Sequence, residues 1–223
     1  MRKWLLVGFL IITVAFAFGQ GMSVGAGLGW APYWNTTRQT VGSSWLQDQD
    51  TSSGFGGQIY FDAKYIEATI GYFGTGSNYT ETVSDSLGET ASMNQTDGAA
   101  GGWLSISILG KLPFHVLGFT LFPVAGFEYD LNLSYTDSNG NNLRSGMTSE
   151  ELSSLNELWF KFGIGADFAV SRAMYIRPTV IGGLKFLSQL DNDNITSLEA
   201  ANGGTFTITY FRLDVGLSVG YNL

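Results

Sequence analysis

Nine charged residues lie inside stretches in which apolar residues alternate with small or polar ones. They are Glu67, Glu128, Asp130, Lys161, Asp167, Arg177, Lys185, Arg212 and Asp214. Such groups could carry out acid–base catalysis or could form ion pairs. Because both signs are present, pairing with nearby cations explains two carboxylates such as Glu128 and Asp130 more simply than acid–base work. The sequence therefore predicts an ion network and no catalytic residue.

Other reactive groups are scarce. The only histidine is His115, in the short connection Pro113-Phe114-His115-Val116, and the chain has no cysteine. Disulfides, thiolate metal sites and a lipid-modified cysteine are therefore excluded. The segment 137–142 begins like a calcium loop, but its glycine is fourth where the motif needs it sixth. We expect no enzyme activity, no metal and no cofactor.

The elements that must position the nine charges are strands, because apolar residues repeat with a period of two. The fifth stretch is the clearest, since odd residues from Phe119 to Tyr135 are mostly apolar and the even ones mostly polar or small. Eight such stretches occur, at 22–30, 55–65, 66–72, 104–112, 119–135, 158–170, 174–186 and 211–223. A phase slip near Thr209 or Tyr210 suggests a β-bulge in the last. The pattern predicts an all-β fold, an eight-stranded antiparallel up-and-down transmembrane β-barrel.

The connections alternate between two sizes. Long polar stretches lie around 35–53, 75–98, 136–157 and 187–204, and short ones near 62–65, 113–118 and 171–173. Outer-membrane barrels have short periplasmic turns and long outer loops, so both ends of the barrel should lie on the periplasmic side. Thr148-Ser149-Glu150-Glu151 matches a capping box and predicts a short helix in the third long connection.

Strand parity also predicts register, because residues directly opposite in a hairpin face the same side of the sheet. Strands six and seven keep their apolar residues at even numbers, which fits a turn at 171–173 and places Asp167 against Arg177. Strands two and three keep opposite parities, which fits a turn centred on 63–64 and places Tyr60 beside Glu67.

The first residues have the order of a secretory signal peptide. Met1-Arg2-Lys3 is followed by an apolar run from Trp4 to Phe18 and then by small residues. The run is shorter than the roughly 20 residues of a membrane-spanning helix. We expect a signal peptide at 1–19, cleaved after Gly19 or Ala17, and the barrel at 20–223. The net charge of −8 argues against nucleic acid as a partner.

Aromatic residues gather near the ends of the expected strands. Those expected at the two membrane interfaces are Trp30, Trp34, Tyr65, Tyr72, Phe119, Tyr135, Phe168, Phe186 and Tyr221. Transmembrane barrels carry such aromatic girdles at both interfaces. A soluble barrel of this size would instead place its larger apolar residues inside. The pattern favours a bilayer, with lipid as the first partner.

The signal peptide, the eight strands, the four long connections and the last strand together resemble the small OmpA/OmpW-type barrels of bacterial outer membranes. In the last strand Val219, Tyr221 and Leu223 resemble the family's C-terminal assembly signal, although the family usually ends in an aromatic residue. The resemblance implies an outer-membrane location, folding by the barrel-assembly machinery and a monomeric state.

An eight-stranded barrel is just wide enough for side chains to fill it. We therefore expect the ion network to plug the lumen, and the exposed outer loops to serve a structural or surface-interaction role with a host or envelope ligand. The alternative is a narrow channel or a transporter of small solutes, hydrophobic ones included, in the manner of OmpW-like barrels.

Overall fold

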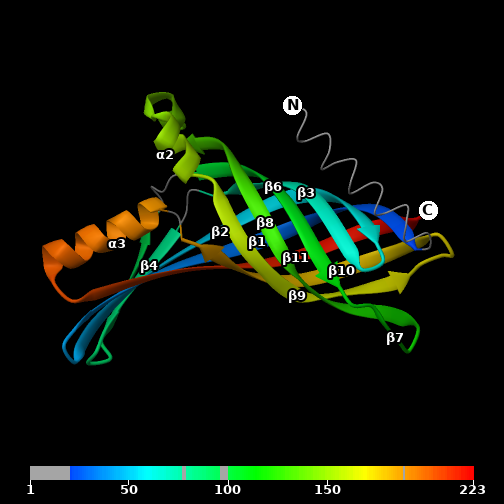
Figure 1. Cartoon of the computed structure of the whole chain (residues 1–223), viewed down its shortest axis with the longest axis horizontal. Coiled ribbons are helices and arrows are strands. Elements are labelled where there is room, and N and C mark those ends of the chain that lie inside the picture. Colours follow the sequence, from blue (N-terminus) through cyan, green and yellow to red (C-terminus); the bar gives the residue numbers. More distant parts are fainter. Residues whose placement is uncertain (1–20, 77–78, 96–99, 188) are drawn as a thin grey trace.

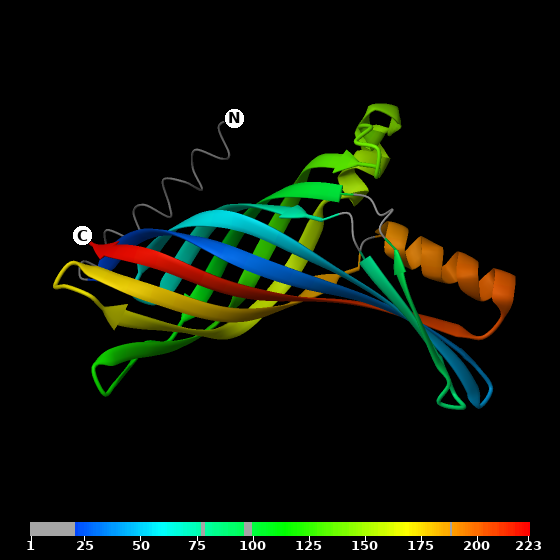
Figure 2. The ribbon, with the colours of Figure 1, turned by 180° about the vertical axis from the view of Figure 1, so that it is seen from behind.

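Eight long antiparallel strands close into a barrel in the computed structural model, which describes residues 21–76, 79–95, 100–187 and 189–223 (Figures 1 and 2). The ring consists of β1 (Met22–Val41), β2 (Ser44–Ala63), β3 (Ile66–Thr75), β6 (Ala100–Lys111), β8 (Phe119–Thr136), β9 (Glu157–Ala169), β10 (Met174–Phe186) and β11 (Thr205–Asn222). Pairing of β11 with β1 closes it, from Ser23 opposite Asn222 onward. The predicted fold is confirmed, and both ends of the barrel chain lie at the same rim. The expected signal peptide lies outside the described residues.

Three ring strands continue well past the barrel and carry the same sheet beyond its rim. Residues 35–41 of β1, 44–50 of β2 and 205–210 of β11 stay paired there, and β4 (Tyr79–Asp85) and β5 (Thr90–Gln95) extend the sheet from β2. We call this part of the sheet the outer extension. It projects from the rim opposite the chain ends (Figure 2). The stretches 35–53 and 75–98, expected as polar connections, are therefore mostly strands, because threonine-rich polar sequence suits a solvated sheet as well as a loop.

Helices occupy the other two long connections. A 3₁₀ turn, η1 (Leu143–Gly146), precedes α2 (Ser149–Ser154), whose capping box is formed by Thr148 and Glu151 as predicted. The last connection contains α3 (Gln189–Asn202), where the sequence indicated only a polar stretch. No helix in the described ranges is both long and apolar enough to cross a bilayer.

One of the two predicted registers is confirmed. Neighbouring pairs such as Ile176 with Phe168 and Thr179 with Gly165 align Asp167 with Arg177. The other is wrong, since Glu67 lies opposite Asp62 and not beside Tyr60. The turn is centred one residue later than expected, because Lys64 adopts a positive φ of 61°. A left-handed lysine is uncommon, and the sequence does not indicate it.

The predicted bulge in the last strand is also wrong. The pairing of β11 with β1 keeps one register from Asn222 to Thr205. The register shift that does occur lies between Gly102 and Trp103, where β6 pairs with β8. Apolar residues change parity near Tyr210 because Phe206, Ile208 and Tyr210 occupy the lumen-side face of the strand, in register with Arg212. The environment of the strand changes there, while its geometry continues.

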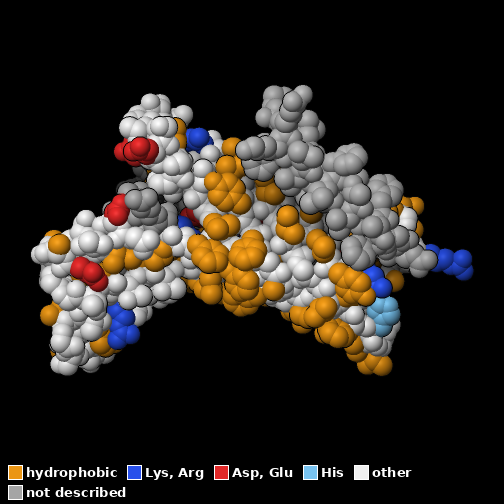
Figure 3. Space-filling view, viewed as in Figure 1, with side chains coloured by type: hydrophobic (Ala, Val, Ile, Leu, Met, Phe, Trp, Pro, Cys, Tyr) orange, Lys and Arg blue, Asp and Glu red, His pale blue; other side chains and the backbone are white. Residues whose placement is uncertain are grey.

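Burial in the barrel is inverted relative to a soluble protein. Charged and hydroxyl side chains such as Lys161, Arg177 and Ser218 are buried in the lumen, while Leu28, Ile59 and Leu217 are about three-fifths exposed on the exterior. Figure 3 shows hydrophobic side chains gathered over the barrel strands. A layer of apolar side chains on the outside requires an apolar medium around it.

Glycines on the lumen side make room for large rings from neighbouring strands. A Cβ at Gly25 would lie 2.3 Å from the Tyr60 ring, and one at Gly220 would lie 2.1 Å from the Tyr175 ring. Both tyrosines then lie across the lumen, where the Tyr60 hydroxyl donates to Tyr175 (3.1 Å) and the Tyr175 hydroxyl lies 2.6 Å from Ser23 Oγ. The small residues of the alternating pattern are therefore part of how the lumen is filled.

Candidate functional site

Arg177 stands at the centre of one charged cluster in the lumen, near the rim that carries the chain ends. Its Nε donates to Asp167 Oδ1 at 2.6 Å and its Nη2 to Asp62 Oδ2 at 2.6 Å, while Nη1 pairs with Glu67. Lys111 also pairs with Asp62. We call these five residues the Arg177 cluster. They come from β2, β3, β6, β9 and β10, so the cluster ties together five of the eight ring strands.

Aromatic rings enclose the same guanidinium. Its Cζ lies 4.6 Å from the ring centroid of Tyr60, 4.8 Å from that of Phe122 and 5.0 Å from that of Tyr175. A cation over aromatic faces is stabilised by the ring quadrupoles, and more strongly so away from water. Arg177 is 1% exposed. Carboxylates and rings together thus compensate for its removal from water.

A second cluster surrounds Arg212, farther toward the outer end. Its Nη1 donates to Asp130 Oδ2 at 2.6 Å, and its Nη2 pairs with Glu128. Asp214 lies 3.0 Å from Arg212 Nε and also pairs with Lys161, whose Nζ is 3.3 Å from Glu128 Oε1. These five residues form the Arg212 cluster. Like the Arg177 cluster, it sets two cations against three carboxylates.

Lys185 takes part in a third contact at the outer end of the lumen. Its Nζ lies 3.4 Å from Glu157 Oε1 and 4.1 Å from the centroid of the Tyr210 ring. Glu157 also accepts a hydrogen bond from Trp159 Nε1 at 3.1 Å. Trp159 is fully buried and packs edge-on against Tyr33, with 5.8 Å between their centroids. Aromatic side chains therefore fill the lumen where the charged clusters end.

All nine charged residues that strand parity assigns to the lumen lie on that side, and each takes part in one of these contacts. Three further members were missing from the expected network: Asp62, Lys111 and Glu157. Asp62 and Lys111 follow the same parity as their strand neighbours, so the signal was present in the sequence. Glu157 stands at the start of β9 and follows the parity of Lys161.

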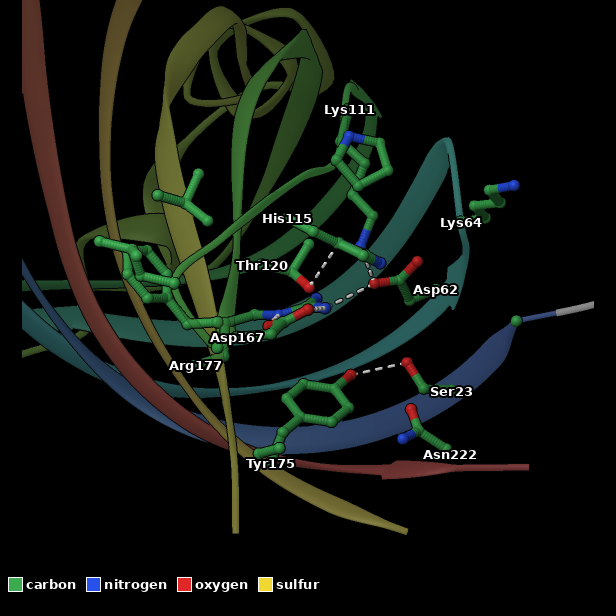
Figure 4. Close-up of a pocket in the computed structure, with 17 residues that line it drawn as sticks. Ser23, Asp62, Lys64, Lys111, His115, Thr120, Asp167, Tyr175, Arg177 and Asn222 are labelled. Carbon is green, nitrogen blue, oxygen red and sulfur yellow. Dashed lines mark hydrogen bonds and ion pairs between the residues drawn. The ribbon is translucent and has the colours of Figure 1, made fainter. Parts of the chain in front are cut away.

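Little free volume remains between the two clusters. A cavity of about 40 Å³ lies there, lined by Glu67 and Arg177 on one side and by Glu128, Lys161 and Asp214 on the other. Such a volume is large enough to hold water. Between the Arg177 cluster and the rim that carries the chain ends, the lumen widens into a vestibule of about 670 Å³ (Figure 4). His115 lines this vestibule with its Nδ1 3.2 Å from Thr120 Oγ1, at the rim that carries the short turns.

The aromatic residues expected at the two interfaces lie toward the two ends of the barrel exterior. Trp30, Tyr72, Phe186 and Tyr221 are about half exposed there. Phe119 and Phe168 stack at 5.1 Å near the short turns, and Trp34 packs on Phe211 at 5.5 Å near the outer extension. Tyr65 lies in the turn after β2, and Tyr135 near the end of β8. In the last strand Val219, Tyr221 and Leu223 point outward.

The segment that begins like a calcium loop is organised by its own hydrogen bonds. Asp137 Oδ1 accepts from the backbone N–H groups of Asn139 (2.9 Å) and Asn141 (2.8 Å). The side-chain amide of Asn141 also donates to Asp137 Oδ2 at 2.8 Å, and this bond, together with the backbone bonds from Asn141 and Asn139, holds the pKa of Asp137 below its ordinary value. The carboxylate therefore serves as the centre of a turn.

No family model matches this chain, and no curated protein matches it. Solved structures do: the N-terminal β-barrel domain of Pseudomonas aeruginosa OprF has 11% identity and a TM-score of 0.41, over 92% of this chain and 100% of that one. Neisserial surface protein A has 8% identity and a TM-score of 0.49, over 91% and 97%. The Pseudomonas aeruginosa outer membrane protein OprG has 9% identity and a TM-score of 0.39, over 91% and 95%. By its own topology, this chain is an eight-stranded up-and-down β-barrel.

Proposed function

We propose that this protein is an integral outer-membrane β-barrel with a closed lumen, which acts at the cell surface through its outer extension and helices. The observation that carries the proposal is the pair of arginine-centred clusters, which bridge the lumen and leave a cavity of only about 40 Å³ between them. Breaking buried ion pairs is costly, so such a plug resists opening.

The bilayer placement is supported by the apolar exterior and by the aromatic residues toward both ends. The cleaved signal peptide at 1–19, the barrel-assembly machinery and the monomeric state remain part of the proposal. So does the recognition role of Val219, Tyr221 and Leu223, which lie outward on the closing strand where an assembly partner could contact them. A catalytic role is not proposed, because the sole histidine lines the vestibule at the short-turn rim and contacts a threonine.

Planar-bilayer recording on the purified full-length chain tests the closed lumen. We expect no steady conductance from the wild type. Arg212→Ala, which removes the bridge to Asp130 and Glu128, should produce transient openings. A steady wild-type conductance that disappears when Arg212 or Glu128 is neutralised would contradict the plug and support a channel.

One observation favours the narrow channel as a second candidate. The vestibule carries solvent as far as the Arg177 cluster, so only the two clusters and the outer aromatic contacts separate it from the outer side. Small ions suit such a path better than hydrophobic solutes, because the lumen presents ionised groups. The same recordings distinguish this candidate from the closed barrel.

A further inference from the structure

The two faces of the outer extension differ sharply in chemistry. Opposed pairs share a face, so one row across the sheet runs through Thr209, Thr36, Gln49, Thr82 and Ser92. This row lies on the exterior face, continuous with the apolar exterior of the barrel. In this sheet every described carboxylate falls on the opposite, lumen-side face. The exterior face is thus uncharged and rich in hydroxyl groups, apart from one cation.

That hydroxyl face is a regular grid. Thr205, Thr207 and Thr209 alternate along β11 and are exposed, while the residues between them are half-buried on the other face. Strands lie about 4.8 Å apart and alternate residues about 6.7 Å, so the hydroxyls repeat at those spacings. Strand propensity alone does not explain the pattern, because the lumen-side face of the same strands carries Phe206, Ile208 and the carboxylates.

The single cation on this face is held in place by an aromatic ring. The Arg38 guanidinium lies 4.8 Å from the centroid of the Trp45 ring, and both residues are on the exterior face, opposite Gln47 and Thr40. A guanidinium matches phosphate geometry, and stacking on a ring pre-organises it. Hydroxyls, amides and one fixed guanidinium are together suited to a phosphorylated saccharide.

The position of the face determines which saccharide meets it. It begins just beyond Trp34 and Phe211, which pack together where the apolar exterior ends. From Trp34 to Thr40 the strand runs roughly 20 Å at about 3.3 Å per residue. The polar zone of a phospholipid leaflet is only about 5–8 Å thick. A face that continues the lipid-facing surface for so much longer suits a leaflet with large headgroups.

We propose that the exterior face of the outer extension docks on the saccharide headgroups of a glycolipid in the outer leaflet around the barrel. This inference rests on the proposed outer-membrane placement. The glycolipid's sugars meet the hydroxyl grid of β11, β1, β2, β4 and β5, and its phosphate meets Arg38. In this arrangement the exterior face of the outer extension lies against the headgroups of the leaflet, and this contact orders the extension.

The test uses the full chain in nanodiscs, with rough-type lipopolysaccharide as the probe and phospholipid alone as the reference. The triple variant Thr36→Val, Thr207→Val and Thr209→Val removes hydroxyls but keeps shape and strand propensity. Thr37→Val, on the lumen-side face, is the matched control. We expect lipopolysaccharide to raise the unfolding midpoint of the wild type and of Thr37→Val. In the triple variant that rise should fall by at least half.

An equal rise in the triple variant, or no rise in the wild type, would overturn the docking. The de-acylated oligosaccharide is a separate arm, and an equal effect from it would overturn the assignment to a membrane glycolipid in favour of a free polysaccharide. A chain that fails to insert into phospholipid nanodiscs would contradict the proposed function itself. Insertion without any lipopolysaccharide effect contradicts only the docking.

Discussion

The barrel and the outer extension share three strands, yet β11 places its apolar residues on opposite faces in the two regions. In the barrel part of β11, Val215 and Leu217 face outward, and Arg212 and Ser218 face the lumen. A few residues earlier the exterior face carries threonines, and the lumen-side face carries Phe206 and Ile208. The register does not change between the two parts. A change in the parity of the apolar residues can therefore mark a change of medium along one continuous strand.

The largest expected difference between the two regions concerns buried charge. Arg177→Met leaves Asp62, Glu67 and Asp167, which are all at least four-fifths buried, without their shared cation. We expect a loss of about 3–5 kcal/mol in the free energy of unfolding. Urea titration of the protein in micelles measures it. Arg38→Met in the outer extension is the control, with an expected loss of about 0–1 kcal/mol. Equal losses of stability in the two variants would contradict the view that charged side chains stabilise the barrel more than the outer extension.

The second difference concerns the exterior faces. Leu217 is 59% exposed on the barrel exterior, where Leu217→Arg would place a charge among lipid chains. An arginine near the bilayer midplane costs about 2–4 kcal/mol, and the cost falls toward zero near the interfaces. Thr207→Arg, on the same face of the same strand, should therefore have little effect. The yield of refolding into phospholipid vesicles compares the two variants. Similar yields would contradict a lipid boundary that lies between positions 207 and 217 of the strand.

A smaller effect is expected at α2. Thr148 Oγ1 accepts from the Glu151 N–H, and the Glu151 carboxylate accepts from the Thr148 N–H at 2.7 Å. Thr148→Ala removes one half of this box and should cost about 1 kcal/mol locally. Hydrogen exchange of the α2 amides should speed up while amides in β9 stay protected. Loss of protection in β9 as well would show that α2 supports the barrel.

The smallest effect is a pH dependence confined to the outer extension. Burial, and then the neighbouring carboxylates of Asp48 and Glu81, raise the pKa of Asp50 above its ordinary value. Folded Asp50 therefore binds its proton more tightly than unfolded Asp50, so stability falls as pH rises through the folded pKa. Hydrogen exchange of β2 amides near Asp50 should slow as pH is lowered toward 4, after correction for intrinsic rates. Asp50→Asn should abolish that slope, and its persistence would assign the effect to another group.

Local alternation determines the number of strands, the face on which each residue lies and the set of residues that line the lumen. These features could therefore be predicted from the sequence. The pairing within the lumen could not. Arg177 reaches Asp62 and Glu67 across more than a hundred residues of chain, and parity places side chains on a face without saying which of them meet.

The outer extension escaped prediction for a different reason. Its strands are polar on one face and mixed on the other, so their composition looks like that of a loop. The tight turn at Gly42, with φ of 61°, lets β1 continue into β2, and it carries no strong signal in its sequence context. α3 was missed because its Asn- and Asp-rich start resembles a turn.

The central claim is that one uninterrupted strand passes from lipid into a polar medium at Tyr210. The chain has no cysteine, so single-cysteine variants can be spin-labelled along β11 without a background signal. Labels at Thr207, Thr209, Val215 and Leu217 in nanodiscs all lie on the exterior face. We expect the last two to be accessible to oxygen and the first two to a water-soluble nickel chelate. A label at Thr207 that is more accessible to oxygen than to the nickel chelate would contradict the claim. So would a label at Thr209 that behaves as if it faced the lumen.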